Sequence, residues 1–533
     1  MTEHDEGTPW SRVHWSTPYL RSWSAFVLGG FVLVQNVGEG AVRSLVRGDR
    51  PEGPGLDGGV PVAPVVLLAV LGGVLALALL VAGLGVVSWR ATRFRVTPQA
   101  LELHHGVVFR SQKAARLDRI QAVDVVRPLL ARLLGLAQLK VEVAGGGDSK
   151  FVLQFLRVPV AREVRARVLA GATASAEARL AVAARATPPV DDAAAAVIGG
   201  AGVVDPAVDM PVPPAPGATA AEDPQAHLPR FLRDDETWPG ESLVEVPLVR
   251  LLASLALSPA LVGLIVALIG LVVTAAVTDS VAPLAFVVPW VLGWAGSLWK
   301  RFTHGYGFRL ATGVQGVRLR HGLLELKTQT VPPGRVQAVR VSQPLLWRGP
   351  DWWRVEVNVA GYGAGGGEDP QTVLLPVGTR AEAVTVVGLV VGDLGEGERS
   401  GQVIDAALTG VADVASPDGA PGTEGSFLVA PRRARRVDPF GYRRIGVRVA
   451  ADALVARGGR WRRHAVVVPH ARTQSLAVEQ GPLQRRMRLA TVVLHSTPGP
   501  VAPEVAHLDE RDAAALAQAQ AARARQARSQ GRQ

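Results

Sequence analysis

Four apolar runs stand out along the chain, at residues 22–37, 60–89, 251–277 and 281–299. The second and third contain no charged residue and exceed the roughly 20 residues that a helix needs to cross ~30 Å of hydrocarbon. The fourth is just long enough, and the first is the weakest. The pattern predicts two transmembrane helical hairpins, over residues 20–89 and 249–299. The alternative for each run is a buried core helix.

Basic residues flank these runs and predict an orientation. Arg90 follows the second run, Arg250 precedes the third, and Lys300 follows the fourth, whereas the turn at 278–280 has no positive charge. The arginines of the loop at 38–59 are a minor contradiction, because acids offset them. We therefore expect a multi-pass protein of the cell inner membrane, with its large polar regions and both termini in the cytoplasm.

Outside the apolar runs, the hydrophobic pattern alternates with a period of two, which is typical of strands. Alternating segments begin at Phe94, Phe308 and Val447, and glycines mark hairpin turns behind them. Further strands follow in each case, and then a helix. Thr379 and Glu382 have capping-box spacing at the start of one such helix. Short antiparallel strands closed by one amphipathic helix predict a small barrel or bent sheet plugged by that helix.

The same pattern occurs three times along the chain. It reads "RIQAVDVVRPLL" from Arg119, "RVQAVRVSQPLL" from Arg335 and "RTQSLAVEQGPLQ" from Arg472. The first two copies align without a gap, and the third needs a slip of one residue before its proline. A repeat of this length indicates three copies of one module.

This pattern resembles the bacterial membrane-flanked domain, also called the bacterial pleckstrin-homology (PH) domain. The first copy carries the resemblance in "FRVTPQALELHHGVVF" and "RIQAVDVV", and the third carries it best, in "RTQSLAVEQGPLQRRMRLATVV". The resemblance implies a seven-stranded, partly open PH barrel with a C-terminal helix in each copy. It implies no particular enzymatic activity. The second copy departs from the family pattern in a loop that contains Trp347, Trp352 and Trp353.

The expected fold class is thus an α-helical membrane protein with two transmembrane hairpins and three cytoplasmic PH-like β-barrel modules, each closed by a C-terminal helix. The modules are expected over residues 90–170, 300–393 and 427–525. Segments poor in aromatic residues, at 171–240 and 394–426, predict flexible linkers.

Composition narrows the possible functions. The 533-residue chain is 48% hydrophobic, with a mean hydropathy of +0.21, a net charge of +11 and no cysteine. It contains no H-E-x-x-H, no phosphate-binding P-loop and no Gly-x-Ser-x-Gly elbow, so we expect no enzyme activity, no cofactor and no metal. The apolar runs hold no charged residue, and Gln35 and Asn36 are the polar exceptions near their ends, which argues against a transport path.

Two sets of residues remain as candidate binding sites. The first is the repeated Arg-x-Gln pair, whose side chains share one face of a strand and bind either a neighbouring loop or a ligand. The second is the arginine-rich third copy, which is either a solvated surface or attracts an anionic membrane by ~1 kcal/mol per residue. The candidates are Arg119, Gln121, Arg335, Gln337, Arg472, Gln474, Arg460, Arg462, Arg463, Arg485 and Arg486.

The function expected from these features is that of a non-enzymatic, membrane-anchored scaffold. It would hold partner proteins or the anionic membrane surface at the cytoplasmic face, within a cell-envelope assembly. Its expected partners are membrane lipids and other membrane or envelope proteins. Nucleic acid is not expected, because no aromatic platform accompanies the charge. The alternative is a component of a transporter or export system.

Overall fold

The structure is a computed structural model. It describes residues 10–17, 89–105, 111–143, 150–171, 242–278, 282–313, 316–360, 373–410, 427–497 and 499–530, with the isolated positions 72, 83, 86 and 87. Strands dominate the described part and form sheets of four, seven, seven and three strands.

In each module, the first four strands lie in one sheet and the last three strands lie in another. Module 1 comprises β1 (Ser11–Arg12), β2 (Arg93–Val96), β3 (Ala100–His105), β4 (Ser111–Arg116), β5 (Ile120–Pro128), β6 (Leu136–Val143) and β7 (Lys150–Arg157). The short helix α3 (Leu129–Leu133) links β5 to β6, and residues 158–171 form the closing helix.

Modules 2 and 3 repeat this order. Module 2 comprises β8 (Val244–Glu245), β9 (Arg309–Gly313), β10 (Gly316–His321), β11 (Glu325–Val331), β12 (Val336–Pro344), β13 (Trp352–Val359), β14 (Val373–Thr379) and the helix α8 (Arg380–Val391). Module 3 comprises β15 (Leu428–Val429), β16 (Gly446–Val449), β17 (Ala453–Gly458), β18 (Arg462–Pro469), β19 (Ser475–Glu479), β20 (Leu489–His495), β21 (Glu504–Asp509) and the helix α11 (Glu510–Gln530). The expected strand-rich modules, each closed by a helix, are confirmed.

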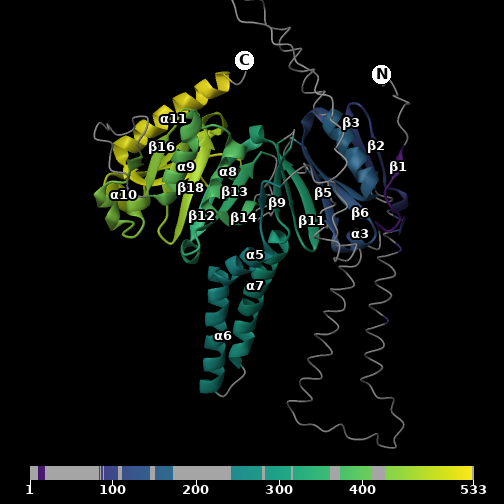
Figure 1. Ribbon diagram of the computed structural model, residues 1–533, viewed down its shortest axis with the longest axis horizontal. Helices are drawn as coiled ribbons and strands as arrows, with labels where there is room; N and C mark the ends of the chain where they lie inside the picture. The colour runs from purple at the N-terminus through teal and green to yellow at the C-terminus, as the bar shows by residue number, and fades with distance from the viewer. Residues whose placement is uncertain are drawn as a thin grey trace, which may run out of the picture.

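The modules are joined through their sheets. Strand β5 of module 1 pairs antiparallel with β11 of module 2, and β12 of module 2 pairs antiparallel with β18 of module 3. Both seven-stranded sheets therefore run across a module boundary, in the orders β7-β6-β5-β11-β10-β9-β8 and β14-β13-β12-β18-β17-β16-β15. The result is a row of modules with module 1 at one end and module 3 at the other (Figure 1).

The described apolar helices are inserted in the sequence between the first two strands of module 2. In module 2, β8 precedes the helices α5 (Leu248–Ala256), α6 (Pro259–Thr278) and α7 (Ala282–Gly305), and β9 follows them and pairs back with β8. The helices α6 and α7 project together away from the sheets (Figure 1). In module 1, β1 likewise pairs with β2, and the apolar runs at 22–37 and 60–89 lie between these two strands in the sequence.

The expected architecture of two transmembrane hairpins is not what the structure shows. Among the described residues, no single helix is both long and apolar enough to cross a membrane. Only the segments Leu248–Ala256 and Pro259–Thr274 together meet that test of length and composition, and they are bent by 50°. The break falls at Pro259, whose ring nitrogen cannot donate the hydrogen bond that would continue α5. The hairpin expected at 20–89 lies almost entirely outside the described residues.

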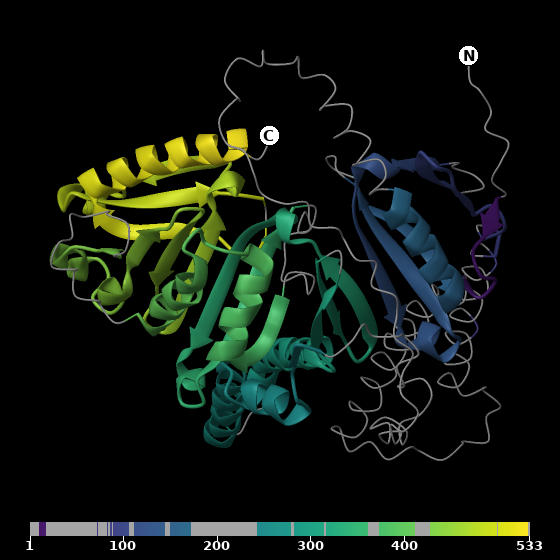
Figure 2. The same ribbon diagram turned by 45° about the horizontal axis from the view of Figure 1, so that its top comes forward.

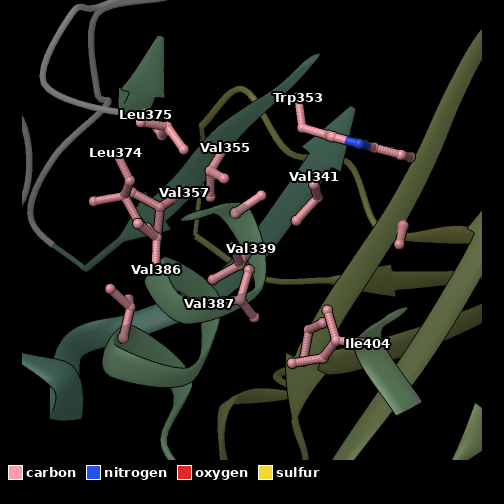
Figure 3. Close-up of a cluster of buried hydrophobic side chains, with 14 of the residues drawn as sticks. Val339, Val341, Trp353, Val355, Val357, Leu374, Leu375, Val386, Val387 and Ile404 are labelled. Carbon is pink, nitrogen blue, oxygen red and sulfur yellow. The ribbon is translucent and has the colours of Figure 1, made fainter. Parts of the chain in front are cut away.

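The core of module 2 lies between one face of its second sheet and the helix α8. Valines from β12 and β13, among them Val339, Val341 and Val357, face Val386 and Val387 of α8, and all five are fully buried (Figure 3). The predicted capping box at Thr379 and Glu382 fixes the start of this helix and is confirmed.

Residues 400–409, which the sequence assigns to the second linker, form the helix α9 (Ser400–Thr409). Its apolar face, including Val403, Ile404 and Ala407, joins the core of module 2 (Figure 3). The helix therefore adds buried apolar area to the second junction, which links module 2 to module 3.

Candidate functional site

A tight hairpin turn between β17 and β18 presents several of the arginines of module 3. Gly459 takes a φ of +80°, and a Cβ atom at this position would lie 2.0 Å from the carbonyl oxygen of Arg462. Glycine is therefore required here by both backbone conformation and space. The turn places Arg460 and Trp461 at its exposed tip.

The second junction brings the turn against module 2. Since β12 pairs with β18, Pro344 lies opposite Arg462, and the loop that follows Pro344 reaches the turn. Arg348 in this loop donates a hydrogen bond to the carbonyl oxygen of Arg460. Arg463 follows at the start of β18 and is half-buried.

Two further arginines lie beneath the turn and bind the carboxyl end of α9. Arg444 donates to the carbonyl oxygens of Thr409 and Leu408, both at 3.0 Å. Arg457 donates to the carbonyl oxygen of Ala406 at 3.3 Å, and its guanidinium lies 4.2 Å from the ring centre of Phe427. The negative end of the helix dipole thus offsets part of their charge.

These five residues form what we call the arginine cluster: Arg348, Arg444, Arg457, Arg460 and Arg463. Burial, followed by the charges of the other four, lowers the pKa of Arg444 to about 10. Burial, followed by the charges of Arg463 and Arg460, also lowers the pKa of Arg348. Burial is the larger cause of both shifts, and the repulsion from neighbouring guanidinium groups adds to it, which shows that like charges gather at this place.

Four of these arginines have no carboxylate partner among the described residues. Within the described part of the chain, Arg348, Arg444, Arg460 and Arg463 form no ion pair with an acidic side chain. The neighbouring Arg462 differs, because its guanidinium lies 3.5 Å from Glu356 and donates to Ser342 at 3.0 Å. Guanidinium groups gathered in this way are suited to bind an anion such as a phosphate group.

Exposed apolar side chains adjoin the cluster. Trp461 at the tip of the turn is 65% exposed, and its ring centre lies 6.3 Å from that of Phe440, which is 63% exposed. Leu345 and Leu346 are exposed in the loop that carries Arg348. Aromatic and aliphatic side chains beside arginines are typical of surfaces that lie at a membrane–water interface.

This surface is tied to the base of the apolar helices. Trp347, next to Arg348, is buried and donates from Nε1 to the carbonyl oxygen of Ser254 in α5 at 3.1 Å. Glu382, which caps α8, also accepts from Arg250 of α5, at 2.7 Å. The arginine cluster therefore lies near the point from which α6 and α7 project.

Of the five further arginines predicted in the third copy, three belong to or adjoin this site, and two do not. Arg460 and Arg463 are in the cluster, and Arg462 borders it. Arg485 and Arg486 are exposed on the helix α10 (Pro482–Arg486), and neither is among the charges that act on Arg444.

The Arg-x-Gln residues lie elsewhere, and two of their arginines contact a neighbouring module. Arg335 donates to the carbonyl oxygen of Ile120 across the first junction, at 3.3 Å, and Gln337 donates to the carbonyl oxygen of Arg335 at 3.2 Å. Arg472 lies beside Gly334 of module 2. Arg119 and Gln474 are exposed, and Gln121 lies in β5 with its side chain outside the described residues.

Sequence reasoning missed Arg348 altogether, and it did not choose Arg444 or Arg457 from among the many arginines of the third copy. Arg348 stands in the loop that departs from the family pattern, and the nearest basic residues in the sequence, Arg340 and Arg354, are not in the cluster. The signal lies only in the pairing of β12 with β18, which joins two modules that are distant in sequence.

Comparison with known proteins agrees with this repeated architecture. The family model described as "Bacterial PH domain" matches residues 58–172, 249–388 and 421–524. No curated protein and no solved structure shows a significant match to the chain. The three matches cover more than half of the sequence and coincide with the three modules, so the chain belongs to the bacterial PH domain family.

Proposed function

We propose that this chain is a non-enzymatic scaffold that binds anionic lipid headgroups at a membrane surface. Repeated bacterial PH domains suggest a binding or scaffold role, and members of the family are typically non-catalytic. The observation that carries the lipid proposal is the arginine cluster, which has an exposed apolar rim and lies at the base of an apolar helical pair.

The helices α6 and α7 support attachment to a membrane. Large apolar side chains are exposed on both, and on α6 they occur around the helix: Val262, Ile265, Val266, Leu268, Ile269, Val272, Val273 and Val277. A helix that is apolar on all sides is stable only where another apolar medium covers it. On α7, Trp290 and Trp299 are exposed, and Lys300 and Arg301 follow them, as expected near a cytoplasmic interface.

Lipid acyl chains are the occupant that fits this surface. Among the described segments, only the bent pair Leu248–Ala256 and Pro259–Thr274 has the length and composition that contact with a hydrocarbon layer requires. The two helices contact each other closely, since a Cβ atom at Gly263 would lie 3.2 Å from the ring of Trp294. Small residues at a helix interface are typical of packing within lipid. We place the modules on the cytoplasmic side of the inner membrane.

The test uses the full chain in a neutral detergent. Short-chain phosphatidylglycerol, below its micelle concentration, should raise the thermal unfolding temperature, and short-chain phosphatidylcholine should not. The double variant Arg460→Gln/Arg463→Gln should lose this response. The matched control, Arg485→Gln/Arg486→Gln, removes the same charge from outside the cluster and should keep it.

Four results would speak against the lipid proposal. Equal responses to the two lipids would mean that charge recognition is absent. Equal loss in both double variants would mean that overall charge, and not the cluster, attracts the lipid. A response to inorganic phosphate as strong as that to phosphatidylglycerol would identify a soluble phosphate site. No response to phosphatidylglycerol, phosphatidylcholine or phosphate would leave an acidic protein as the partner.

A further inference from the structure

Both junctions between modules use the same strands in the same register. In the first, Val125 of β5 lies opposite Thr328 of β11. In the second, Val341 of β12 lies opposite Ala465 of β18. Each pair occupies the same two positions of the repeat. The junction is therefore a reusable interface, in which the fifth strand of one module pairs antiparallel with the fourth strand of the next.

In the third module, the same fifth strand pairs with no strand of another module in the described part of the chain. The strand is β19, which pairs with β20 and is the last strand of its sheet in the described part of the chain. The valine at the repeated position is 5% exposed at Val125, 0% at Val341 and 46% at Val478. An apolar side chain that is buried at both internal junctions is thus exposed at the open end.

The first module presents the complementary strand at the other end of the row. This strand is β4, which pairs with β3 and ends its sheet within the described residues. Gln112 of β4 occupies the position of Thr328 and Ala465. Arg119 follows β4 and is exposed, whereas its counterpart Arg335 bonds the preceding module across the first junction.

We propose that β19 of one molecule pairs antiparallel with β4 of a second copy of this chain, in the register of the internal junctions. Val478 then lies opposite Gln112, and Glu479 lies opposite Ser111. Glu479 also comes diagonal to Lys113, so opposite charges meet on one face of the new sheet. The two strands belong to modules 1 and 3, which stand at opposite ends of the row (Figure 2), so the contact joins two different molecules.

An open edge strand with exposed apolar residues is a template for another strand. The contact joins different surfaces of the two molecules, so repeated addition produces a ring or an open filament. One strand pair buries less than the ~1,200 Å² of a standard interface, so the association is weak and depends on concentration. This inference is independent of lipid binding by the arginine cluster.

Cysteine crosslinking tests the register directly, because the natural chain has no cysteine. Full-length Val478→Cys is mixed in neutral detergent with a size-tagged Gln112→Cys, and with a size-tagged Lys113→Cys as control. Residues directly opposite each other share a face, whereas the neighbouring residue points to the other face. We expect several-fold more mixed disulfide with Gln112→Cys than with Lys113→Cys. Equal yields would overturn the proposal.

Sedimentation of the full chain over a range of concentrations provides the second measurement. The wild type should associate as concentration rises, and Val478→Lys should stay monomeric, because it places a charge at the centre of the pair. Val160→Lys, at a 39% exposed position on the helix over residues 158–171, is the matched control and should associate like the wild type. A wild type that stays monomeric throughout, or association that Val478→Lys leaves unchanged, would contradict strand pairing. Arg460→Gln/Arg463→Gln should associate normally, which separates this result from a failure of lipid binding.

Discussion

Asn358 and Val501 exchange two hydrogen bonds across the second junction. The Nδ2 group of Asn358 donates to the carbonyl oxygen of Val501 at 2.6 Å, and the amide nitrogen of Val501 donates to Oδ1 at 2.9 Å. Both residues are buried, and they come from module 2 and module 3 respectively. The side-chain amide thus satisfies the backbone N–H and C=O groups of Val501, as a neighbouring strand would. These bonds fix the position of module 3 on module 2.

Asn358→Ala should weaken the second junction. The substitution leaves the buried N–H and C=O groups of Val501 without partners, which costs about 2 kcal/mol. Hydrogen exchange should show faster exchange at residues 499–503, with module 1 unchanged. Gln474→Ala removes an exposed amide of similar size and should leave exchange in that loop as it is in the wild type. Equal effects of the two substitutions would mean that Asn358 does not hold the loop.

Gly459→Ala should destabilise the hairpin that carries Arg460. The positive φ and the close approach to the Arg462 carbonyl oxygen oppose any side chain, at a cost of about 2 kcal/mol. Gly388→Ala, within α8 and with open space around the Cβ position, should instead stabilise the chain by up to about 1 kcal/mol. Thermal unfolding of both variants measures the contrast. A turn that tolerates alanine would show that β17 and β18 do not require this geometry.

Acid should destabilise module 2 through His321. Burial, followed by the charge of Lys327, lowers the pKa of His321 to about 4, although a bond from Nδ1 to the carbonyl oxygen of His304 opposes the shift. The folded state therefore holds the neutral ring, whereas the unfolded chain binds a proton near pH 6.5. Stability is complete above pH 6.5 and falls by about 3 kcal/mol as the pH drops towards 4.

His321→Gln removes this titration and tests the assignment. Its hydrogen exchange in β10 should vary less between pH 7 and pH 4.5 than that of the wild type, after correction for the intrinsic rate. A pH dependence that is identical in the two proteins would assign the acid sensitivity to another group. His495→Gln, at an exposed position, is the control and should behave like the wild type.

Arg463→Met should stabilise the chain and weaken its response to anions. Removing one of the like charges that act on Arg444 and Arg348 relieves repulsion, and methionine retains much of the packing volume. We expect a gain of up to about 1 kcal/mol at low salt, which shrinks as salt screens the cluster. Thermal unfolding at two ionic strengths measures both effects. A loss of stability at low salt would indicate that Arg463 has a structural partner and is not part of a binding site.

The sequence predicted the modules well, for physical reasons that act locally. The period-two alternation, the turn glycines and the Thr379–Glu382 cap depend on neighbouring residues, so they predict strands, hairpins and a helix start from the chain itself. The same local reasoning failed for the apolar helices. Hydropathy alone does not show that the chain breaks and bends at Pro259.

By itself, the sequence determined that three copies of one PH-like module exist and that each ends in a helix, because repetition and periodicity are written along the chain. Only the tertiary structure decided how the copies are joined. The pairing of β12 with β18 brings Arg348 to Arg460 and leaves Val478 exposed on an unpaired edge. Strand pairing between distant segments depends on which edges meet in space, and no local pattern of residues encodes that choice.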